Sequence, residues 1–266
     1  MNREELIDTI TRKVVERLQS EAGAGRAASG NGTATSGAAP GPEPVLDINR
    51  YVDHTLLRPE ATREQVLELV REARDYRFRA VCVNGCWTEL CATELRGTDV
   101  GIATVVGFPL GAMVSRIKAA EARLAVEQGA DEIDMVLNIG ALKDGDYELL
   151  RRDILAVTRV TGSRLTTKVI IETSRLTDEE KIIACQIAED AGAGFVKTST
   201  GFLGGGATVH DVALMRKTVS PSVKVKASGG IRSRDEAVAM IRAGADRLGT
   251  SAGVAIVTGG SGSGAY

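Results

Sequence analysis

Eight short runs of β-forming residues are the feature that most constrains the fold. They recur from about residue 47 onwards at intervals of roughly 20 to 35 residues, and stretches with helical spacing lie between most of them. The runs are RYVDHT, RAVCVN, GIATVVG, EIDMVLN, TKVIIET, GFVKTST, VKVKASGG and DRLGTS. Eight strands that alternate with helices predict an α/β fold of the (β/α)8 or TIM-barrel type.

A doubly wound open sheet is the main competing architecture for this alternation. Such sheets usually carry the glycine pattern G-x-G-x-x-G directly after their first strand. The first run, RYVDHT, is followed by LLRPEAT, which contains no glycine. The sequence therefore favours the closed barrel.

Composition excludes several classes of protein. The formal net charge is −2 and the pI is about 5.9, so no basic excess is available to attract nucleic acid. No apolar run reaches the ~18 residues that a membrane span needs, and the N-terminus lacks the apolar stretch of a signal peptide. The cysteines match no zinc-binding spacing; they are Cys82, Cys86, Cys91 and Cys185. We therefore expect reduced thiols, no metal and a cytoplasmic location.

The N-terminal region differs in composition from the rest of the chain. Residues 21–45 consist mostly of small residues and proline, which cannot bury a core, and they predict a flexible linker. Residues 1–20 predict an amphipathic helix with an apolar stripe of Leu6, Ile7, Ile10, Val14 and Leu18. One helix of this length is marginal in water, so the stripe needs a partner, either in its own domain or oligomer or in another protein. The barrel is expected at 46–258 and a flexible tail at 259–266.

Three lysines lie within predicted strands, where lysine is disfavoured and is rarely buried without a partner. They are Lys168, Lys197 and Lys226. One structural explanation is a set of buried lysine–carboxylate pairs, with Asp134 or Glu172 as the carboxylate. Three such lysines on neighbouring strands, together with an acid, favour a functional site instead, because the chemistry of a barrel lies at the C-terminal ends of its strands.

Clustered ammonium groups indicate a particular chemistry. Burial and neighbouring cations both disfavour the charged form of a lysine, so the pKa of one lysine falls towards neutral. Its free amine can then attack a carbonyl carbon and form an imine, which acts as an electron sink. With a carboxylate to move protons, these are the parts of a class I aldolase. Lys224 lies nearer the start of its strand, and we assign it a structural role.

Small-residue loops after the seventh and eighth runs predict a phosphate site. Ser228-Gly229-Gly230 ends the seventh run before a helical stretch, and Gly249-Thr250-Ser251 ends the eighth. Loops after these two strands often bind phosphate, because glycine lets backbone N–H groups approach and a helix N-terminus favours an anion. A glycine pair alone is more often a simple turn, so the prediction depends on both loops.

Segments spread along the whole barrel carry a family resemblance. They are YVDHTLLRPEAT, AVCVN, ATVVGFPLGA, DEIDMVLNIGALK, TKVIIET, AGAGFVKTSTGF, KASGGIR and LGTSAG. With them the chain resembles the deoxyribose-phosphate aldolase family from about Ile48 to Tyr266; FVKTSTG and DMVLNIG are the most specific segments. The resemblance implies reversible joining of acetaldehyde to D-glyceraldehyde 3-phosphate to give 2-deoxy-D-ribose 5-phosphate. It also implies no metal or organic cofactor, and a homo-oligomer, either a dimer or a tetramer.

The resemblance implies roles for individual residues. Lys197 forms the Schiff base, Lys226 lowers its pKa, and Asp134 moves protons through a bound water. Lys168 and Asp53 complete the polar network. The residues implied in holding the substrate and its phosphate are Thr198, Thr200, Ser228, Gly229, Gly230, Gly249 and Ser251.

Both ends of the chain extend beyond the predicted barrel. Composition predicts a disordered tail at TGGSGSGAY, but some family members end in a tyrosine that assists proton transfer, so the resemblance makes Tyr266 a catalytic candidate. The N-terminal extension resembles the encapsulation peptides of bacterial microcompartment enzymes. That likeness implies binding to shell proteins through residues 1–20 and a location inside a microcompartment.

Other functions remain open at this point. Another Schiff-base aldolase or a phosphosugar isomerase would use the same barrel. A non-catalytic protein carried to a shell by its helix would not need the lysines and the acid together. Metal-dependent or Ser–His–Asp hydrolysis is disfavoured, because the two histidines, His54 and His210, are expected to lie in no ligand-spaced cluster.

Overall fold

The computed structural model describes residues 47–262, and within them eight parallel strands close into a barrel. Neighbouring strands pair in chain order, and β1 pairs with β8 to complete the ring. The strands are β1 (Val52–Leu56), β2 (Ala80–Val83), β3 (Gly101–Val106), β4 (Glu132–Val136), β5 (Thr166–Ile170), β6 (Phe195–Lys197), β7 (Lys224–Ser228) and β8 (Arg247–Thr250). The predicted (β/α)8 fold is confirmed, and each of the eight runs overlaps one strand.

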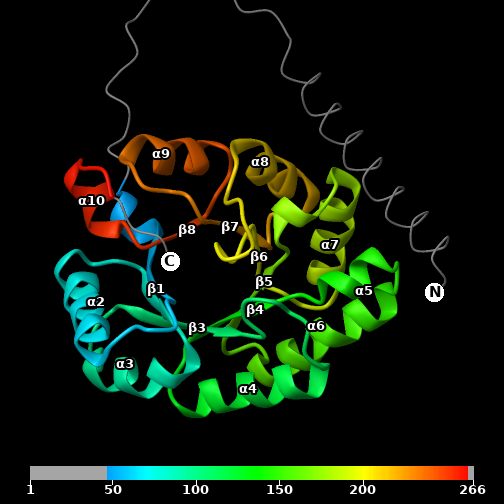
Figure 1. Cartoon of the computed structure of the whole chain (residues 1–266), viewed down its shortest axis with the longest axis horizontal. Helices are drawn as coiled ribbons and strands as arrows, with labels where there is room; N and C mark the ends of the chain where they lie inside the picture. Colours follow the sequence, from blue (N-terminus) through cyan, green and yellow to red (C-terminus); the bar gives the residue numbers. More distant parts are fainter. Residues whose placement is uncertain (1–46, 263–266) are drawn as a thin grey trace, which may run out of the picture. The chain divides into compact units, whose positions relative to one another are not determined.

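Helices surround the strands as a ring in Figure 1. The α-helices are α2 (Arg63–Asp75), α3 (Thr88–Glu94), α4 (Ser115–Glu127), α5 (Ile139–Lys143), α6 (Tyr147–Thr161), α7 (Asp178–Asp190), α8 (Val209–Thr218), α9 (Arg234–Arg242) and α10 (Gly253–Thr258). Short 3-10 helices are η1 (Ile48–Tyr51), η2 (Gly85–Trp87) and η3 (Thr173–Arg175). The helix and linker expected at 1–45 lie outside the described residues, as does Tyr266.

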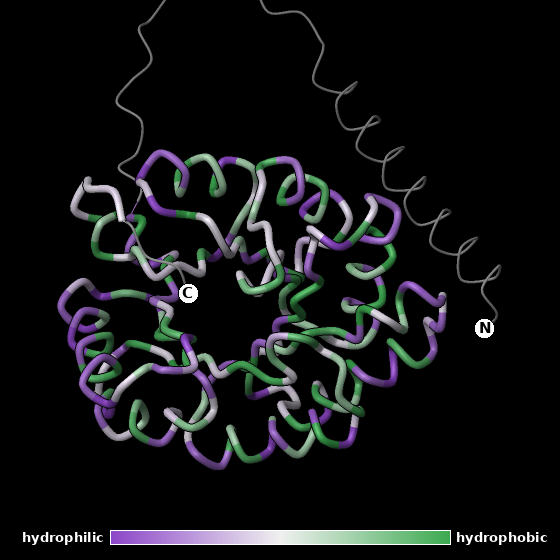
Figure 2. Tube along the Cα trace, in the orientation of Figure 1, coloured by the Kyte–Doolittle hydropathy of each residue, from purple (hydrophilic) through white to green (hydrophobic). Residues whose placement is uncertain are grey.

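Local sequence determines where several helices begin. Three of them start with a capping box, in which a Ser or Thr side chain and a Glu or Gln side chain three residues later each accept a backbone N–H from the other. The pairs are Thr62 with Gln65, Thr177 with Glu180, and Ser233 with Glu236. Figure 2 shows hydrophobic and hydrophilic residues alternating around the helices, as expected for helices that cover a barrel on one side.

Inside the barrel, apolar and charged side chains occupy different sectors. Leu57, Cys82, Ala103 and Val105 form a buried apolar cluster around β2 and β3, with Phe108 packed against it. The opposite sector holds the lysines, because the register aligns Lys168 of β5 with Asp134 of β4 and aligns Lys197 of β6 with Lys226 of β7. The barrel interior is therefore the place to look for chemistry.

No helix within residues 47–262 combines the length and the apolar character that crossing a membrane requires.

Candidate active site

Three lysines converge on the carboxylate of Asp134 inside the barrel. Lys197 Nζ and Lys226 Nζ both donate to Oδ2 of Asp134 at 2.8 Å, and Lys168 Nζ donates to Oδ1 at 2.8 Å. Lys168, Lys226 and Asp134 are fully buried, and Lys197 is 3% exposed. Lys226 also donates to Asp53, so the structure brings together all five polar residues predicted for this network.

A second layer of charge, which was not predicted from the sequence, lies nearer the N-terminal ends of the strands. Glu132 is the first residue of β4 and Arg247 is the first residue of β8. Arg247 donates to Asp53 Oδ1 at 2.6 Å and to both oxygens of Glu132 at 3.2 Å. Glu132 also accepts from Lys168, so this pair is continuous with the lysine cluster.

An aromatic ring forms part of the same layer. Phe195 of β6 has three cations over its ring, with Lys168 Nζ and Lys224 Nζ at 5.8 Å from the centroid and Arg247 at 5.4 Å. Lys224 itself is exposed at the start of β7. Its position agrees with the structural role expected for it, and the buried cluster does not include it.

Burial and neighbouring charges lower the pKa of Lys197. Desolvation is the larger cause and the ammonium of Lys226 adds to it, while Asp134 acts in the opposite direction. The sequence had predicted the effect of Lys226; the structure adds that burial is the stronger cause. An amine with a lowered pKa is the form of lysine that attacks carbonyl carbons.

The other charged groups of the cluster are held in their ionised forms. Burial acts to lower the pKa of Lys226, but the carboxylates of Asp134 and Asp53 outweigh it and keep that pKa well above its ordinary value. Burial likewise acts to raise the pKa of Asp134, and the lysines at 168, 197 and 226 outweigh it, so its pKa is well below the usual range. Within the described interior, Lys197 is the lysine of the cluster whose pKa falls.

The segments predicted to bind phosphate lie at the C-terminal ends of β7 and β8: Ser228 ends β7, Gly249 and Thr250 end β8, and Gly229, Gly230 and Ser251 follow the strands. Gly229 and Gly230 have φ angles of +86° and +79°, a region that favours glycine. The buried Oγ of Ser228 has no hydrogen-bond partner among residues 47–262. The side chains of Ser228 and Lys226 pack closely against Gly249. A Cβ at this position would lie 2.5 Å from Ser228 Oγ and 3.1 Å from Cε of Lys226.

The predicted substrate-binding threonines, which follow β6, make structural hydrogen bonds. Thr198 Oγ1 donates to Ser228 O at 3.2 Å and accepts from Ser228 N at 3.0 Å, which ties the ends of β6 and β7 together. The backbone N–H of Thr200 donates to Glu172 Oε2 at 3.0 Å. Glu172 therefore holds this loop, and Asp134 rather than Glu172 is the lysine partner.

An aromatic pair borders the apolar sector of the barrel. Phe108 follows β3 and Phe202 follows β6, and their rings meet edge to face with centroids 5.2 Å apart. Phe202 is 37% exposed and lies two residues beyond Thr200. The pair was not predicted, because both residues lie outside the strand-like runs.

One group of side chains outside the barrel interior has the spacing of a metal site. Ligand atoms of Asp178, His210 and Asp211 lie within 4.8 Å of one another, so the expectation that His210 lies in no such cluster is wrong. Lys181 Nζ donates to both aspartates, at 2.9 and 2.7 Å. An ammonium already neutralises these carboxylates, and the group is better explained as a surface ion-pair network than as a cation site.

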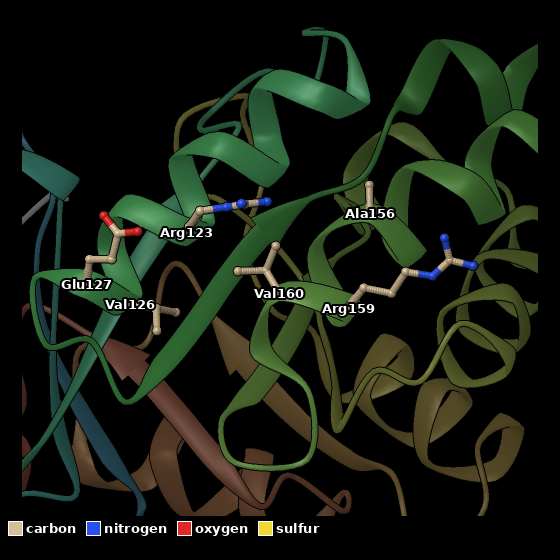
Figure 3. A pocket seen from close by; sticks show the side chains of 6 residues that line it. All are labelled: Arg123, Val126, Glu127, Ala156, Arg159 and Val160. Carbon is tan, nitrogen blue, oxygen red and sulfur yellow. The ribbon is translucent and has the colours of Figure 1, made fainter.

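A surface pocket between α4 and α6 is also distinct from the lysine cluster (Figure 3). Its lining comes from the outer helices and consists of Arg123, Val126, Glu127, Ala156, Arg159 and Val160. None of these residues lies on a barrel strand. The barrel interior is the better candidate for chemistry.

Comparison with known proteins agrees with this geometry. A family model described as DeoC/LacD family aldolase matches residues 48–259. The deoxyribose-phosphate aldolase of Streptococcus gordonii is 59% identical over 221 residues, which cover 83% of this chain and all of that protein. The enzyme of the same name from Brevibacillus brevis is 58% identical over 214 residues, covering 80% of this chain and 96% of that one.

A solved structure shares the fold as well. The deoxyribose phosphate aldolase of Aeropyrum pernix, whose structure is described as a unique tetramer, matches with a TM-score of 0.75 and 34% identity. The match covers 80% of this chain and 90% of that one.

Proposed function

The chain belongs to the DeoC/LacD family of aldolases, and on that premise we propose that it cleaves 2-deoxy-D-ribose 5-phosphate reversibly to D-glyceraldehyde 3-phosphate and acetaldehyde. It is a class I aldolase, a carbon–carbon lyase. The observation that carries the proposal is the convergence of three buried lysines on Asp134, of which Lys197 alone has a lowered pKa within the described interior.

Lys197 is the nucleophile of this proposed mechanism. Its neutral Nζ attacks the C1 aldehyde of the open-chain sugar, the carbonyl oxygen leaves as water, and an iminium remains. Loss of the C3 hydroxyl proton sends the electrons of the C2–C3 bond to the iminium nitrogen. C3 becomes the aldehyde of glyceraldehyde 3-phosphate, and C1 and C2 remain as an enamine. Protonation of C2 and addition of water then release acetaldehyde and restore the amine.

Asp134 and Lys226 support the proton transfers of these steps. Asp134 Oδ2 lies 2.8 Å from both Lys197 and Lys226, which places it to orient the amine and a bound water. Its low pKa makes it a weak base while three ammonium groups surround it. Deprotonation of Lys197 removes one of those charges and makes Asp134 a better proton acceptor. Lys226 remains charged and holds Asp134 together with Asp53.

The phosphate of the substrate is assigned to the loops after β7 and β8. Gly229, Gly230, Gly249 and Ser251 are the residues proposed to approach the phosphate, and the unpaired Oγ of Ser228 supplies a hydroxyl donor. α9 begins at Arg234, so its N-terminus lies close in the chain to Gly230. Thr198 and Thr200 shape the floor of this site through their hydrogen bonds to Ser228 and Glu172.

Tyr266 is a further proposed participant in proton transfer. The chain leading to it is held beside the phosphate loop, because Gly262 N donates to Arg232 O at 3.0 Å and Ser261 pairs with Ser233. Four further residues can span roughly 13 Å when extended. That reach supports a role for Tyr266 at the barrel mouth, and Tyr266→Phe should slow exchange of the acetaldehyde methyl protons more than it slows imine formation.

Trapping with borohydride tests the reaction. Wild-type protein should cleave deoxyribose 5-phosphate and, with acetaldehyde and borohydride, should lose activity as one reduced adduct forms on Lys197. Lys197→Met should remain folded, lose at least roughly a thousandfold in kcat and form no adduct. Full activity without an adduct at Lys197 would exclude the mechanism and would favour a phosphosugar isomerase or another lyase chemistry.

Assembly and location complete the proposal. We propose that the chain forms a homo-oligomer, a dimer or a tetramer, and the tetrameric relative supports this. We also propose a cytoplasmic location. Residues 1–20 are proposed to bind microcompartment shell proteins, with 21–45 as the linker, because the composition of 1–45 resembles an encapsulation peptide.

Deletion of residues 1–44 tests this division of the chain. The family match begins at residue 48, so kcat and KM of the truncated protein should stay within about twofold of wild type. Co-sedimentation with co-expressed shell proteins should be lost. A large drop in kcat would instead assign the N-terminal segment to the barrel, and unchanged co-sedimentation would refute the shell-binding role.

A further inference from the structure

We propose that Glu132 and Arg247 form a buried positioning pair whose opposite charges compensate each other, and that this compensation keeps the resting state of Lys197 as the uncharged amine. This inference rests on the proposed role of Lys197 in imine formation. The two residues lie at the starts of β4 and β8, below the lysine cluster, and are 7% and 6% exposed.

The pair contacts the cluster at two points. Glu132 accepts from Lys168, which also donates to Asp134, and Asp134 in turn accepts from Lys197. Arg247 donates to Asp53. Asp53 also accepts from Lys226, which in turn donates to Asp134. Each member of the pair is therefore connected to Asp134 through one lysine, by a continuous path of buried hydrogen bonds.

The charge count explains why this matters for Lys197. The described buried network holds four basic side chains, at 168, 197, 226 and 247, and three carboxylates, at 53, 132 and 134. With every group of this ion-paired network ionised its net charge is +1, and with Lys197 deprotonated the net charge is zero. The buried carboxyl of Glu172 is not part of this network; its Oε2 accepts from the backbone N–H of Thr200. A buried region resists net charge, so the neutral amine of Lys197 is the form that balances the whole network.

Titratable groups face Lys197 from most of the strands around it. They are Asp53 of β1, Cys82 of β2, Glu132 and Asp134 of β4, Lys168 of β5, Glu172 just beyond β5, Lys226 of β7 and Arg247 of β8. β3 contributes Ala103 and Val105 to the interior cluster. Burial raises the pKa of the Cys82 thiol, which keeps it uncharged. Glu172 Oε2 accepts from the backbone N–H of Thr200, and its Oε1 has no hydrogen-bond partner within residues 47–262.

Two substitutions that remove opposite charges should shift the pH dependence of activity in opposite directions. Glu132→Gln removes a negative charge, so the ammonium form of Lys197 loses stabilisation and the amine appears at lower pH. Arg247→Gln removes a positive charge and has the opposite effect. Each should move the acid limb of the kcat/KM profile by about one pH unit, down for Glu132→Gln and up for Arg247→Gln. The double variant should return the limb to the wild-type position.

The measurement is kcat/KM for deoxyribose 5-phosphate from pH 5 to 10, in parallel with the rate of borohydride trapping by acetaldehyde. Glu132→Asp and Arg247→Lys keep the charges and should keep the limb in place even where kcat falls. Asp153→Asn is the matched control, since it removes a carboxylate from the buried Lys118–Asp153 pair beneath α4 and α6 and should lower the melting temperature without moving the limb.

Each outcome decides one question. Opposite shifts that cancel in the double variant support the inference, and a limb that stays in place, or moves the same way in both variants, overturns it. If one single variant fails to fold, the other still has a predicted direction of shift. The double variant and the two charge-conserving variants keep the wild-type net charge and define the position from which that shift is measured. Absence of a wild-type adduct at Lys197 would refute the proposed function itself, which is a separate result.

Discussion

Lys197 and Lys226 lie side by side in the β6–β7 register and are both buried, yet their pKa values move in opposite directions. The difference lies in the number of carboxylates that each ammonium contacts. Lys226 contacts Asp53 and Asp134, whereas Lys197 contacts Asp134 alone. One carboxylate does not offset complete desolvation and two do, which is why only one of these neighbours is suited to nucleophilic attack.

Gly249 gives a prediction at the scale of a single atom. An added Cβ would lie 2.5 Å from Ser228 Oγ and 3.1 Å from Lys226 Cε, so Gly249→Ala must displace one or both side chains. We expect kcat/KM to fall roughly 10- to 100-fold while the fold is retained, because small displacements of catalytic groups have effects of that size. Steady-state kinetics and circular dichroism would measure this.

Gly85→Ala is the matched control for Gly249→Ala. Its nearest heavy atom to a new Cβ is 4.0 Å away, at Thr104, so nothing has to move. Equal loss of activity in both variants would contradict the steric explanation.

At the level of single residues, the lysines and aspartates of the site were predicted from the sequence, whereas Glu132 and Arg247 were not. Lysines in strands are conspicuous because the residue type is disfavoured there. Glu132 and Arg247 occupy strand starts, where charged residues are common, and only their spacing of two residues before Asp134 and Gly249 indicates that they face the same side. Glu172 was a reasonable lysine partner, but its backbone has a positive φ of 58° and its side chain accepts from Thr200 N.

At the scale of elements, the sequence located the eight strands because parallel barrel strands are short, β-branched and separated by helices. The sequence did not indicate which charged residues on the helices are buried. Lys118 lies on the amphipathic helix α4, where a lysine is normally exposed, yet it is fully buried and donates to Asp153 and to Val136 O. Its partner lies 35 residues away, beyond the range of any local pattern.

The N-terminus of α9 gives a prediction at the scale of an element. Ser233 caps this helix, and Ser233→Ala should destabilise the protein by about 1 kcal/mol. The same loss should loosen the loop from Gly229 to Ser233, so KM for deoxyribose 5-phosphate should rise roughly two- to fivefold with little change in kcat. Urea unfolding and initial rates would measure the two effects.

Thr62→Ala removes the same kind of cap from α2 and serves as the control. It should lower stability by a similar amount and leave KM unchanged. A rise in KM of equal size in both variants would mean that general loosening, rather than the phosphate loop, accounts for the effect.

For the whole molecule, the buried charges give stability a pH dependence. The folded pKa values of Asp53, Glu132 and Asp134 are below their unfolded values near 4, because neighbouring cations outweigh burial. Their contribution is therefore complete above about pH 5 and is lost as the pH falls further. Lys168 and Lys226 have raised pKa values, so their contribution is complete below about pH 10 and is lost as the pH rises through the folded values.

We expect the free energy of unfolding to fall by on the order of 3 kcal/mol or more between pH 6 and pH 3. Urea titrations followed by circular dichroism at each pH would measure it. Glu132→Gln should show a shallower decline, since one of the three carboxylates is absent. A free energy that stays constant over this range would show that the carboxylates are not ionised in the folded state.

The contact between Arg247 and Asp53 also bears on how the chain reaches its native state. These residues are 194 positions apart, and they lie on the last and first strands, whose pairing closes the barrel. A nascent chain that has not yet released β8 from the ribosome therefore lacks both the closing strand and one of the cations that neutralise Asp53. Catalytic competence should consequently appear only at the end of synthesis, and turnover by fragments that stop short of residue 247 should be undetectable until β8 is supplied in trans.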